Sequence, residues 1–228
     1  MINEGLFRLQ QATGSSQVLS STIASEPLVF IKDATLATQS GGRLATNEQA
    51  TFFDIVFNPQ TNTFDSVEIS ERRITFGDWD ETDAAANVAR LDEVPREIAF
   101  VWAGAEPITA LIPLQVGYWD SFLQLSGWTQ ERPDDITFFD VTPDAEWFYL
   151  QSAPFADAAG TLSPEDDFAT MWKLIIQNQF ADPAAPVDPA NPINDEALIP
   201  KLASVDQFFA LLGTGDRNDP GTLGPEVA

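Results

Sequence analysis

The sequence predicts a mainly β protein of the α+β class, with an antiparallel β-sandwich or barrel-like body, one or two C-terminal helices and extended terminal arms. Eight short runs of β-branched and aromatic residues come before any clear helical pattern. Helix signals gather after residue 160, and both ends of the chain are polar. With 44% hydrophobic residues, 17 Phe and 6 Trp, the 228-residue chain can bury one sizeable core.

The expected domain organisation follows changes in composition along the chain. Residues 1–25 are rich in Gln, Ser and Thr and are predicted to form a polar N-terminal arm. Residues 26–160 form the predicted β-rich body. Residues 161–213 form a helical segment with a Pro-rich bridge at 182–192, and residues 214–228 form an extended tail.

The predicted strands are short runs bounded by Asn, Pro, Gly or Asp. They begin at Leu28, Thr51, Ser66, Ile74, Ile98, Ile108, Ile136 and Glu146. Phe53, Ile55 and Phe57 are spaced by two residues, which is the pattern of a half-buried strand. The segment 58–62, with two Asn and a Pro, predicts the turn that follows.

Two helices are predicted near the C-terminus. Ser163 is suited to be an N-cap, Pro164 to the first helical position, and Asp166 to the positive end of the helix dipole. A second helix is expected to begin near Ser204 and to end at Gly213. The apolar stripe of the first helix consists of Phe168, Met171, Trp172, Ile175 and Ile176.

The chain contains no His, no Cys and only three Lys, which removes most of the side chains that serve as nucleophiles, proton shuttles or zinc ligands. The sequence therefore predicts no catalytic residue and no cofactor. A carboxylate-dependent hydrolase would need one buried acid, and the candidates are Glu146 beside Trp147 and Glu106 near Trp102. We interpret the tryptophans themselves as core and interface anchors, since large aromatic residues dominate burial there.

The net charge of −24, from 35 acidic and 11 basic residues, indicates a surface that repels phosphate backbones. Direct nucleic-acid binding is therefore not expected. No stretch reaches the ~20 apolar residues of a membrane span. The first residues lack the basic start and apolar run of a secretory signal peptide, so the expected location is a virion or the cytoplasm.

The acidic run at residues 78–83 is the candidate metal site. Asp78, Asp80, Glu81 and Asp83 could supply the hard oxygen ligands that calcium prefers. The run lacks the central glycine and the distant glutamate of an EF-hand loop. An ordinary solvated acidic turn is the alternative interpretation.

These observations predict a non-enzymatic structural subunit of a large oligomeric assembly, most concretely a virion or phage-tail-like particle component. Its partners would be copies of itself and other assembly subunits, because extended arms can complete a neighbour's sheet edge. The alternative is a glycan- or calcium-binding module that uses the tryptophans and residues 78–83. A carboxylate-dependent hydrolase is the third hypothesis.

Overall fold

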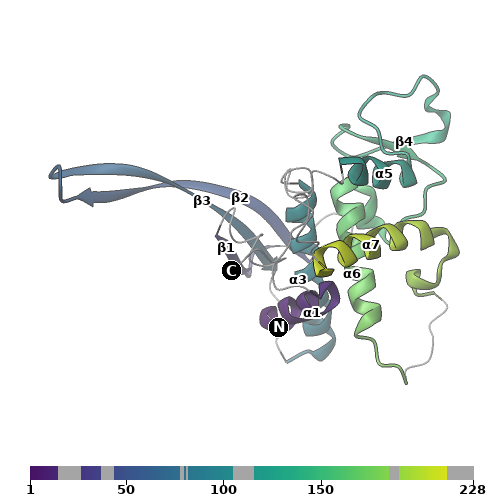
Figure 1. Cartoon of the computed structure of the whole chain (residues 1–228), viewed down its shortest axis with the longest axis horizontal. Helices are drawn as coiled ribbons and strands as arrows, with labels where there is room; N and C mark the ends of the chain where they lie inside the picture. The colour runs from purple at the N-terminus through teal and green to yellow at the C-terminus, as the bar shows by residue number, and fades with distance from the viewer. Residues whose placement is uncertain are drawn as a thin grey trace.

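The computed structural model describes residues 1–14, 27–36, 44–77, 80, 82–104, 116–184 and 190–214. Helices account for 50% of the structure and strands for 22%, in two small separate sheets. The predicted mainly β sandwich or barrel is therefore wrong. The molecule consists of a helical body from which one long β-hairpin projects (Figure 1).

The described α-helices are α1 (Ile2–Thr13), α3 (Ala84–Gly104), α5 (Val116–Ser126), α6 (Pro164–Gln179) and α7 (Ile199–Thr214). The strands are β1 (Leu28–Asp33), β2 (Ala45–Asn58), β3 (Thr63–Gly77), β4 (Phe139–Val141) and β5 (Phe148–Leu150). Short 3-10 helices are η3 (Ile136–Phe138), η4 (Ala158–Thr161), η5 (Pro192–Asn194) and η6 (Glu196–Leu198). None of the described helices is both long enough and apolar enough to cross a bilayer.

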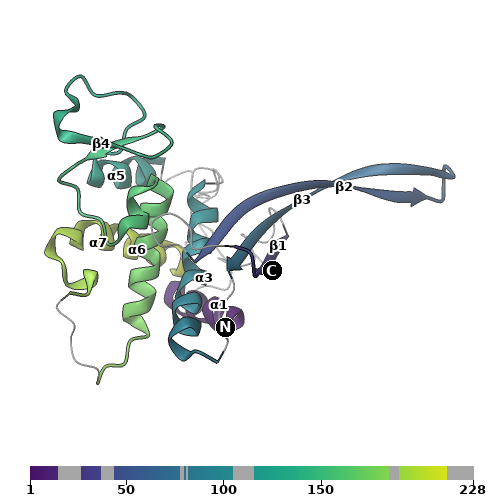
Figure 2. The same ribbon diagram turned by 180° about the vertical axis from the view of Figure 1, so that it is seen from behind.

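The larger sheet has the strand order β1-β3-β2. β1 runs parallel to β3, with Leu28 opposite Arg72, and β2 runs antiparallel to β3, with Asn58 opposite Thr63. β4 and β5 form the second sheet in a separate lobe beside α5, away from the hairpin (Figure 2). The predicted strands at Leu28 and Thr51 and the turn after Asn58 are confirmed.

The core lies between α3, α6 and α7 and is centred on Phe168 and Trp172, both fully buried. The ring of Phe168 lies 5.3 Å from Phe122 and 5.7 Å from Phe208 in edge-on contacts. Trp172 meets Phe209 in the same way at 4.7 Å. Such aromatic contacts each contribute about 0.5–1.5 kcal/mol beyond the area that they bury. The interpretation of Trp172 as a core anchor is confirmed.

The predicted strand at Ile98 is wrong, because this run lies in α3. Asp83 starts the helix, since its Oδ1 accepts hydrogen bonds from the backbone N–H groups of Ala85 at 2.9 Å and Ala86 at 3.2 Å. Val94 and Ile98 are four residues apart and both fully buried, which is the spacing of one helix face. The next predicted strand, from Ile108, lies largely outside the described residues, and α5 begins at its end.

The predicted extended N-terminal arm is replaced by α1 over residues 2–13. Gly5, Leu9 and Thr13 recur every four residues and form its buried face. Gly5 packs so closely on α3 that an added Cβ would lie 2.7 Å from the Cβ of Val94. This helix is part of the core. Removing it would therefore damage the fold and would not simply delete an appendage.

The predicted start of α6 is confirmed, since the Ser163 side chain accepts a hydrogen bond from the Asp166 N–H at 3.0 Å and Pro164 occupies the first position. The predicted helix start at Ser204 is wrong, because α7 begins at Ile199. Asp195 caps the preceding turn by accepting from the Ala197 N–H at 2.9 Å.

Gly5→Ala tests the contact between α1 and α3. Alanine is the better helix former by about 1 kcal/mol, but its methyl group would overlap Val94, so we expect a net loss of about 1–3 kcal/mol in the free energy of unfolding. Denaturant unfolding measures this loss. Gln11→Ala, at an exposed position of the same helix, is the control and should leave stability nearly unchanged. A Gly5→Ala variant as stable as Gln11→Ala would contradict the close packing.

Candidate interaction site

The outer part of the β2–β3 hairpin, residues 50–71, extends beyond the rest of the sheet, and we call it the arm. β1 pairs with β3 from Arg72 to Gly77, so the arm beyond this pairing is a ribbon of two strands. At ~3.3 Å per residue, positions 50–58 span about 30 Å. Both views show the arm projecting away from the helical body (Figures 1 and 2).

The tip of the arm exposes large apolar side chains. Phe64 is 72% exposed and Ile55 70% exposed, and Val56 and Phe57 are about half exposed. Phe57 and Phe64 face each other across the ribbon, with their ring centroids 5.3 Å apart. Apolar residues that are gathered in this way, unlike scattered ones, mark an interaction surface.

The turn at the tip is organised by local hydrogen bonds. Asn58 donates from Nδ2 to Oδ2 of Asp65 at 3.0 Å, and its Oδ1 accepts from the Gln60 N–H at 3.1 Å. Asn62 has a positive φ of 54°, a conformation that Asn tolerates better than most residues. These contacts fix the direction in which the two rings are presented.

The strand predicted at Ile55 and Phe57 is present, but these side chains are exposed and the expectation of a half-buried strand is wrong. The alternation is present, but the buried positions of the hairpin lie at its base, where Ala45, Ile74 and Phe76 join the core. The described side chains from position 55 to 66 are exposed, apart from that of Asn58, which is half-buried. An isolated two-stranded ribbon is at best marginally stable in water, so the arm lacks the support that a third strand or a packed helix would supply.

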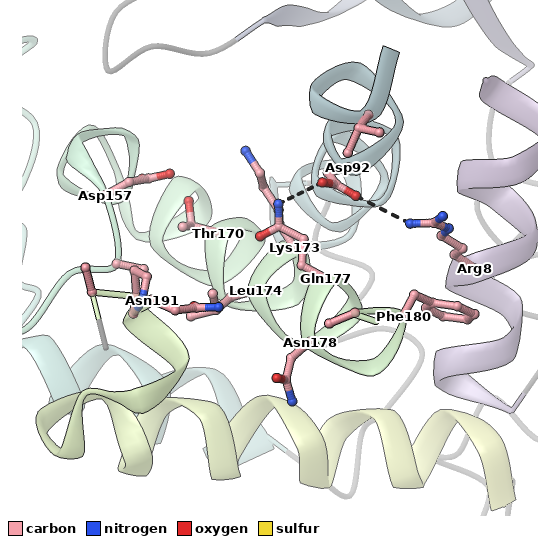
Figure 3. Close-up of a pocket in the computed structure, with 15 residues that line it drawn as sticks. Arg8, Asp92, Asp157, Thr170, Lys173, Leu174, Gln177, Asn178, Phe180 and Asn191 are labelled. Carbon is pink, nitrogen blue, oxygen red and sulfur yellow. Dashed lines mark hydrogen bonds and ion pairs between the residues drawn. The ribbon is translucent and has the colours of Figure 1, made fainter. Parts of the chain in front are cut away.

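A groove runs along the outer face of α6, with a cavity volume of about 590 Å³ (Figure 3). α1 and α3 form one side, and the segment around η5 forms the other. Asp92 of α3 links α1 to α6, which forms the floor of the groove. It accepts a hydrogen bond from Nε2 of Gln177 at 2.9 Å and lies 3.8 Å from the Arg8 guanidinium, which covers the Phe180 ring.

Thr170 lines the same groove from α6. Its side chain is almost completely buried, and its hydroxyl has no hydrogen-bond partner among the described residues. A buried hydroxyl without a partner costs about 1–3 kcal/mol.

Two clusters of charged side chains are buried at the start of α6. Arg96 binds Glu93 at 3.3 Å, Glu97 at 2.9 Å and Asp166 at 2.5 Å. Burial alone would lower the pKa of Arg96, but the attraction of these three carboxylates raises it. Asp166, expected only to interact with the helix dipole, thus fastens α6 to α3.

The second cluster pairs Asp167 with Lys201 of α7, whose Nζ lies 2.7 Å from Oδ2. The same carboxylate accepts hydrogen bonds from Ser126 at 2.9 Å and from the Trp128 indole at 3.1 Å. Burial raises the pKa of Asp167, and the attraction of Lys201 opposes this. Burial likewise lowers the pKa of Lys201, against the attraction of Asp167.

The second cluster cannot be reached from the groove. Asp167 and Lys201 are at most 1% exposed, and neither lines the groove, so a substrate could not reach them. Their role is to hold α5, α6 and α7 together. No sequence motif predicts these pairs, because partners such as Asp167 and Lys201 lie far apart along the chain.

The candidate calcium ligands are only partly described, since Asp78 and Glu81 lie outside the described residues. Asp80 is exposed, and the hydroxyl and N–H of Thr82 lower its pKa by donating to its carboxylate. Asp83 caps α3. The described residues contain no group of three possible metal ligands, and the calcium site stays a prediction.

The structure describes only one of the two candidate acids of a hydrolase. Glu146 is exposed, so it lacks the burial that keeps a general acid protonated, and Glu106 lies outside the described residues. Trp147 packs edge-on against Trp128 at 6.4 Å, inside the β4–β5 lobe. This supports the anchoring interpretation of these two tryptophans.

Comparison with protein family models, with curated proteins and with solved structures finds no match for this chain.

Asp167→Asn and Lys201→Met test the structural role of the second cluster. Each change leaves its partner buried without an opposite charge, so we expect each to lower the free energy of unfolding by about 3–5 kcal/mol. The double variant should lose clearly less than the sum of the two. Denaturant unfolding gives all three values, with Glu4→Gln, which breaks an exposed ion pair, as the nearly silent control. Additive losses would show that the two residues are not coupled.

Proposed function

We propose that this chain is a non-enzymatic structural subunit of a homo-oligomeric assembly, and that it attaches to a neighbouring subunit through the arm. One observation carries this proposal. The arm is a two-stranded ribbon that presents Phe57, Phe64 and Ile55 to solvent, although burial of such side chains is the main source of stability in proteins.

The energetics favour a partner for the arm. Fully burying one Phe or Ile side chain yields about 1.5–3 kcal/mol, so a neighbour that covers three of them would supply several kcal/mol. The long open edges of the ribbon add main-chain donors and acceptors, which can pair with a strand of another subunit. A soluble monomer would gain nothing from keeping such an element exposed.

The inventory of reactive groups supports a role without chemistry. The chain has no His or Cys, and among the described residues the pairs of Arg96 with Asp166 and of Lys201 with Asp167 are buried and do not line the groove. The virion or phage-tail-like particle remains the most concrete form of the proposal. Such a particle would hold many copies of the chain at high local concentration, where contacts that are individually weak become stable together.

Phe57→Ser combined with Phe64→Ser tests the proposal. Both rings are exposed, so the variant should keep the stability of the body but lose the apolar surface through which subunits associate. Light scattering over a range of protein concentrations, at low and high salt, measures the mass of the assembly. We expect the unaltered protein to form oligomers and the double variant to form smaller species or monomers.

Phe138→Ser is the matched control, because Phe138 is 64% exposed and lies in η3, in the β4–β5 lobe on the far side of the body. It should leave the assembly mass unchanged. Two results would overturn the proposal. In the first, the unaltered chain is monomeric under every condition. In the second, the tip variant assembles as well as the Phe138→Ser control.

A further inference from the structure

We propose that two copies of this chain associate by pairing the outer part of β2, residues 50–58, edge to edge and antiparallel about Ile55. This inference rests on the proposed function and names the partner of the arm, which is the same arm in a second copy. The two ribbons then form one four-stranded sheet in the order β3-β2-β2-β3. Sheets of three or more strands with an apolar face are stable where a lone ribbon is marginal, so this pairing supplies the support that the arm lacks.

The outer part of β2 lacks the usual protection of an edge strand. β2 is an outermost strand, since the sheet order is β1-β3-β2, and such a strand directs the N–H and C=O groups of every second residue outward. Natural edge strands are commonly short or interrupted by Lys, Pro or a bulge. Residues 50–58 contain no Lys, Arg or Pro, and the register of β2 with β3 is continuous from Ala45 to Asn58. This edge is therefore long and regular, as pairing with a further strand requires.

Charge distinguishes the two edges of the arm. The β3 strand of the arm carries Asp65, Glu68 and Glu71, whereas the β2 strand carries only Asp54. Pairing two β3 edges would gather the carboxylates of both copies in adjacent strands, where like charges repel. Pairing two β2 edges instead leaves both β3 strands on the outside of the new sheet. The base of the outer β3 edge is also occupied, because β1 pairs with residues 72–77.

Two-fold symmetry restricts the register of this pairing. In an antiparallel ladder the outward-pointing main-chain groups belong to alternate residues, and on two identical edges these are the same residues. Two paired positions therefore have numbers that are both even or both odd. One residue must then lie opposite its own copy at the symmetry axis, since a two-fold contact is self-complementary. The possible registers can thus be compared by the residue at their centre.

Ile55 is the centre that pairs apolar residues and separates the acidic ones. It sets Ile55 opposite its own copy and Phe57 opposite Phe53. Asp54 then lies opposite Val56, whereas centring the ladder on Asp54 would set two carboxylates against each other. Centring on Phe53 would set Phe57 opposite a polar residue, and centres nearer the turn would shorten the ladder. Aromatic and β-branched residues at opposite positions stabilise a sheet, and like charges there destabilise it, so the Ile55 register is favoured.

The exposed side chains of the arm also fit this arrangement. Ile55 is 70% exposed, Phe57 is about half exposed, and the Phe64 ring lies 5.3 Å from that of Phe57. Side chains two residues apart on a strand share a face. Pairing about Ile55 therefore brings Ile55 and Phe57 of both copies onto one continuous apolar face, with a Phe64 ring at each side. Contacts across the new interface remove from water part of the surface that a single ribbon exposes.

Disulfide trapping tests this pairing directly, because the chain has no native cysteine. Ile55→Cys places each thiol opposite its own copy, with the Cα atoms about 4.5–5.5 Å apart, inside the limit of about 7 Å for a disulfide. Gln60→Cys in the tip turn and Ser66→Cys on β3 are the controls, and both positions are exposed. In the proposed sheet each control residue lies more than about 10 Å from its copy. Each variant is oxidised separately and analysed on a non-reducing gel.

We expect Ile55→Cys to give roughly tenfold or more disulfide-linked dimer than either control, because pairing raises the effective concentration of the two thiols. A matched pair of lysine variants gives an independent measurement. Ile55→Lys sets like charges opposite each other at the symmetry axis, so the assembly mass in light scattering should fall. Ser66→Lys makes the same change at the opposite position of β3 and should leave the mass unchanged.

Other outcomes separate this inference from the proposed function. Equal dimer yields from the three cysteine variants, or the highest yield from Gln60→Cys or Ser66→Cys, would overturn the pairing about Ile55 while light scattering still reports oligomers. An Ile55→Lys variant that assembles as well as Ser66→Lys would overturn it in the same way. If the unaltered chain is monomeric by light scattering under every condition, both proposals fail.

Discussion

Two adjacent carboxylates at the start of α6 hold the body of this protein together. Asp166 binds Arg96 of α3, and Asp167 binds Lys201 of α7. Buried pairs of this kind add little net stability when both partners are present, but they allow few alternative arrangements, since any misplacement leaves a buried charge unpaired. The helical body is thereby fixed at the point from which the hairpin departs. Asn47 of β2 continues this link by donating to the backbone carbonyl of Glu97 at 2.9 Å.

The hairpin is anchored at its base and exposed at its far end. Ile74 and Phe76 anchor the hairpin in the core, whereas Ile55 and Phe64 at its far end are exposed by about 70%. The exposed aromatic rings, about 30 Å beyond the sheet, are the reason for proposing that the arm attaches to a neighbouring subunit.

Features that depend on neighbouring residues could be predicted from the sequence, whereas features that depend on distant residues could not. Ser163 and Pro164 predict the start of α6, because a helix cap is formed within four residues. The turn after Asn58 is likewise formed by neighbouring residues. The run at Ile98 was wrongly predicted to be a strand, because β-branched residues also occur in buried helices. The four-residue spacing between Val94 and Ile98 was the pattern that indicated a helix. The alternation near Ile55 was correct, but a strand pattern does not say whether anything covers its apolar face. The groove joins residues from four separate elements, so no local motif predicts it.

We propose that the arm obtains from a partner the stability that its own chain does not provide. Hydrogen exchange followed by mass spectrometry, at dilute and concentrated protein, tests it most directly. We expect peptides from residues 50–71 to exchange rapidly in the dilute sample and to become protected as the protein concentration rises, while α3 and α6 stay protected throughout. Strong protection of the arm in a dilute, monomeric sample would contradict a role for a partner, because the ribbon would then be stable alone.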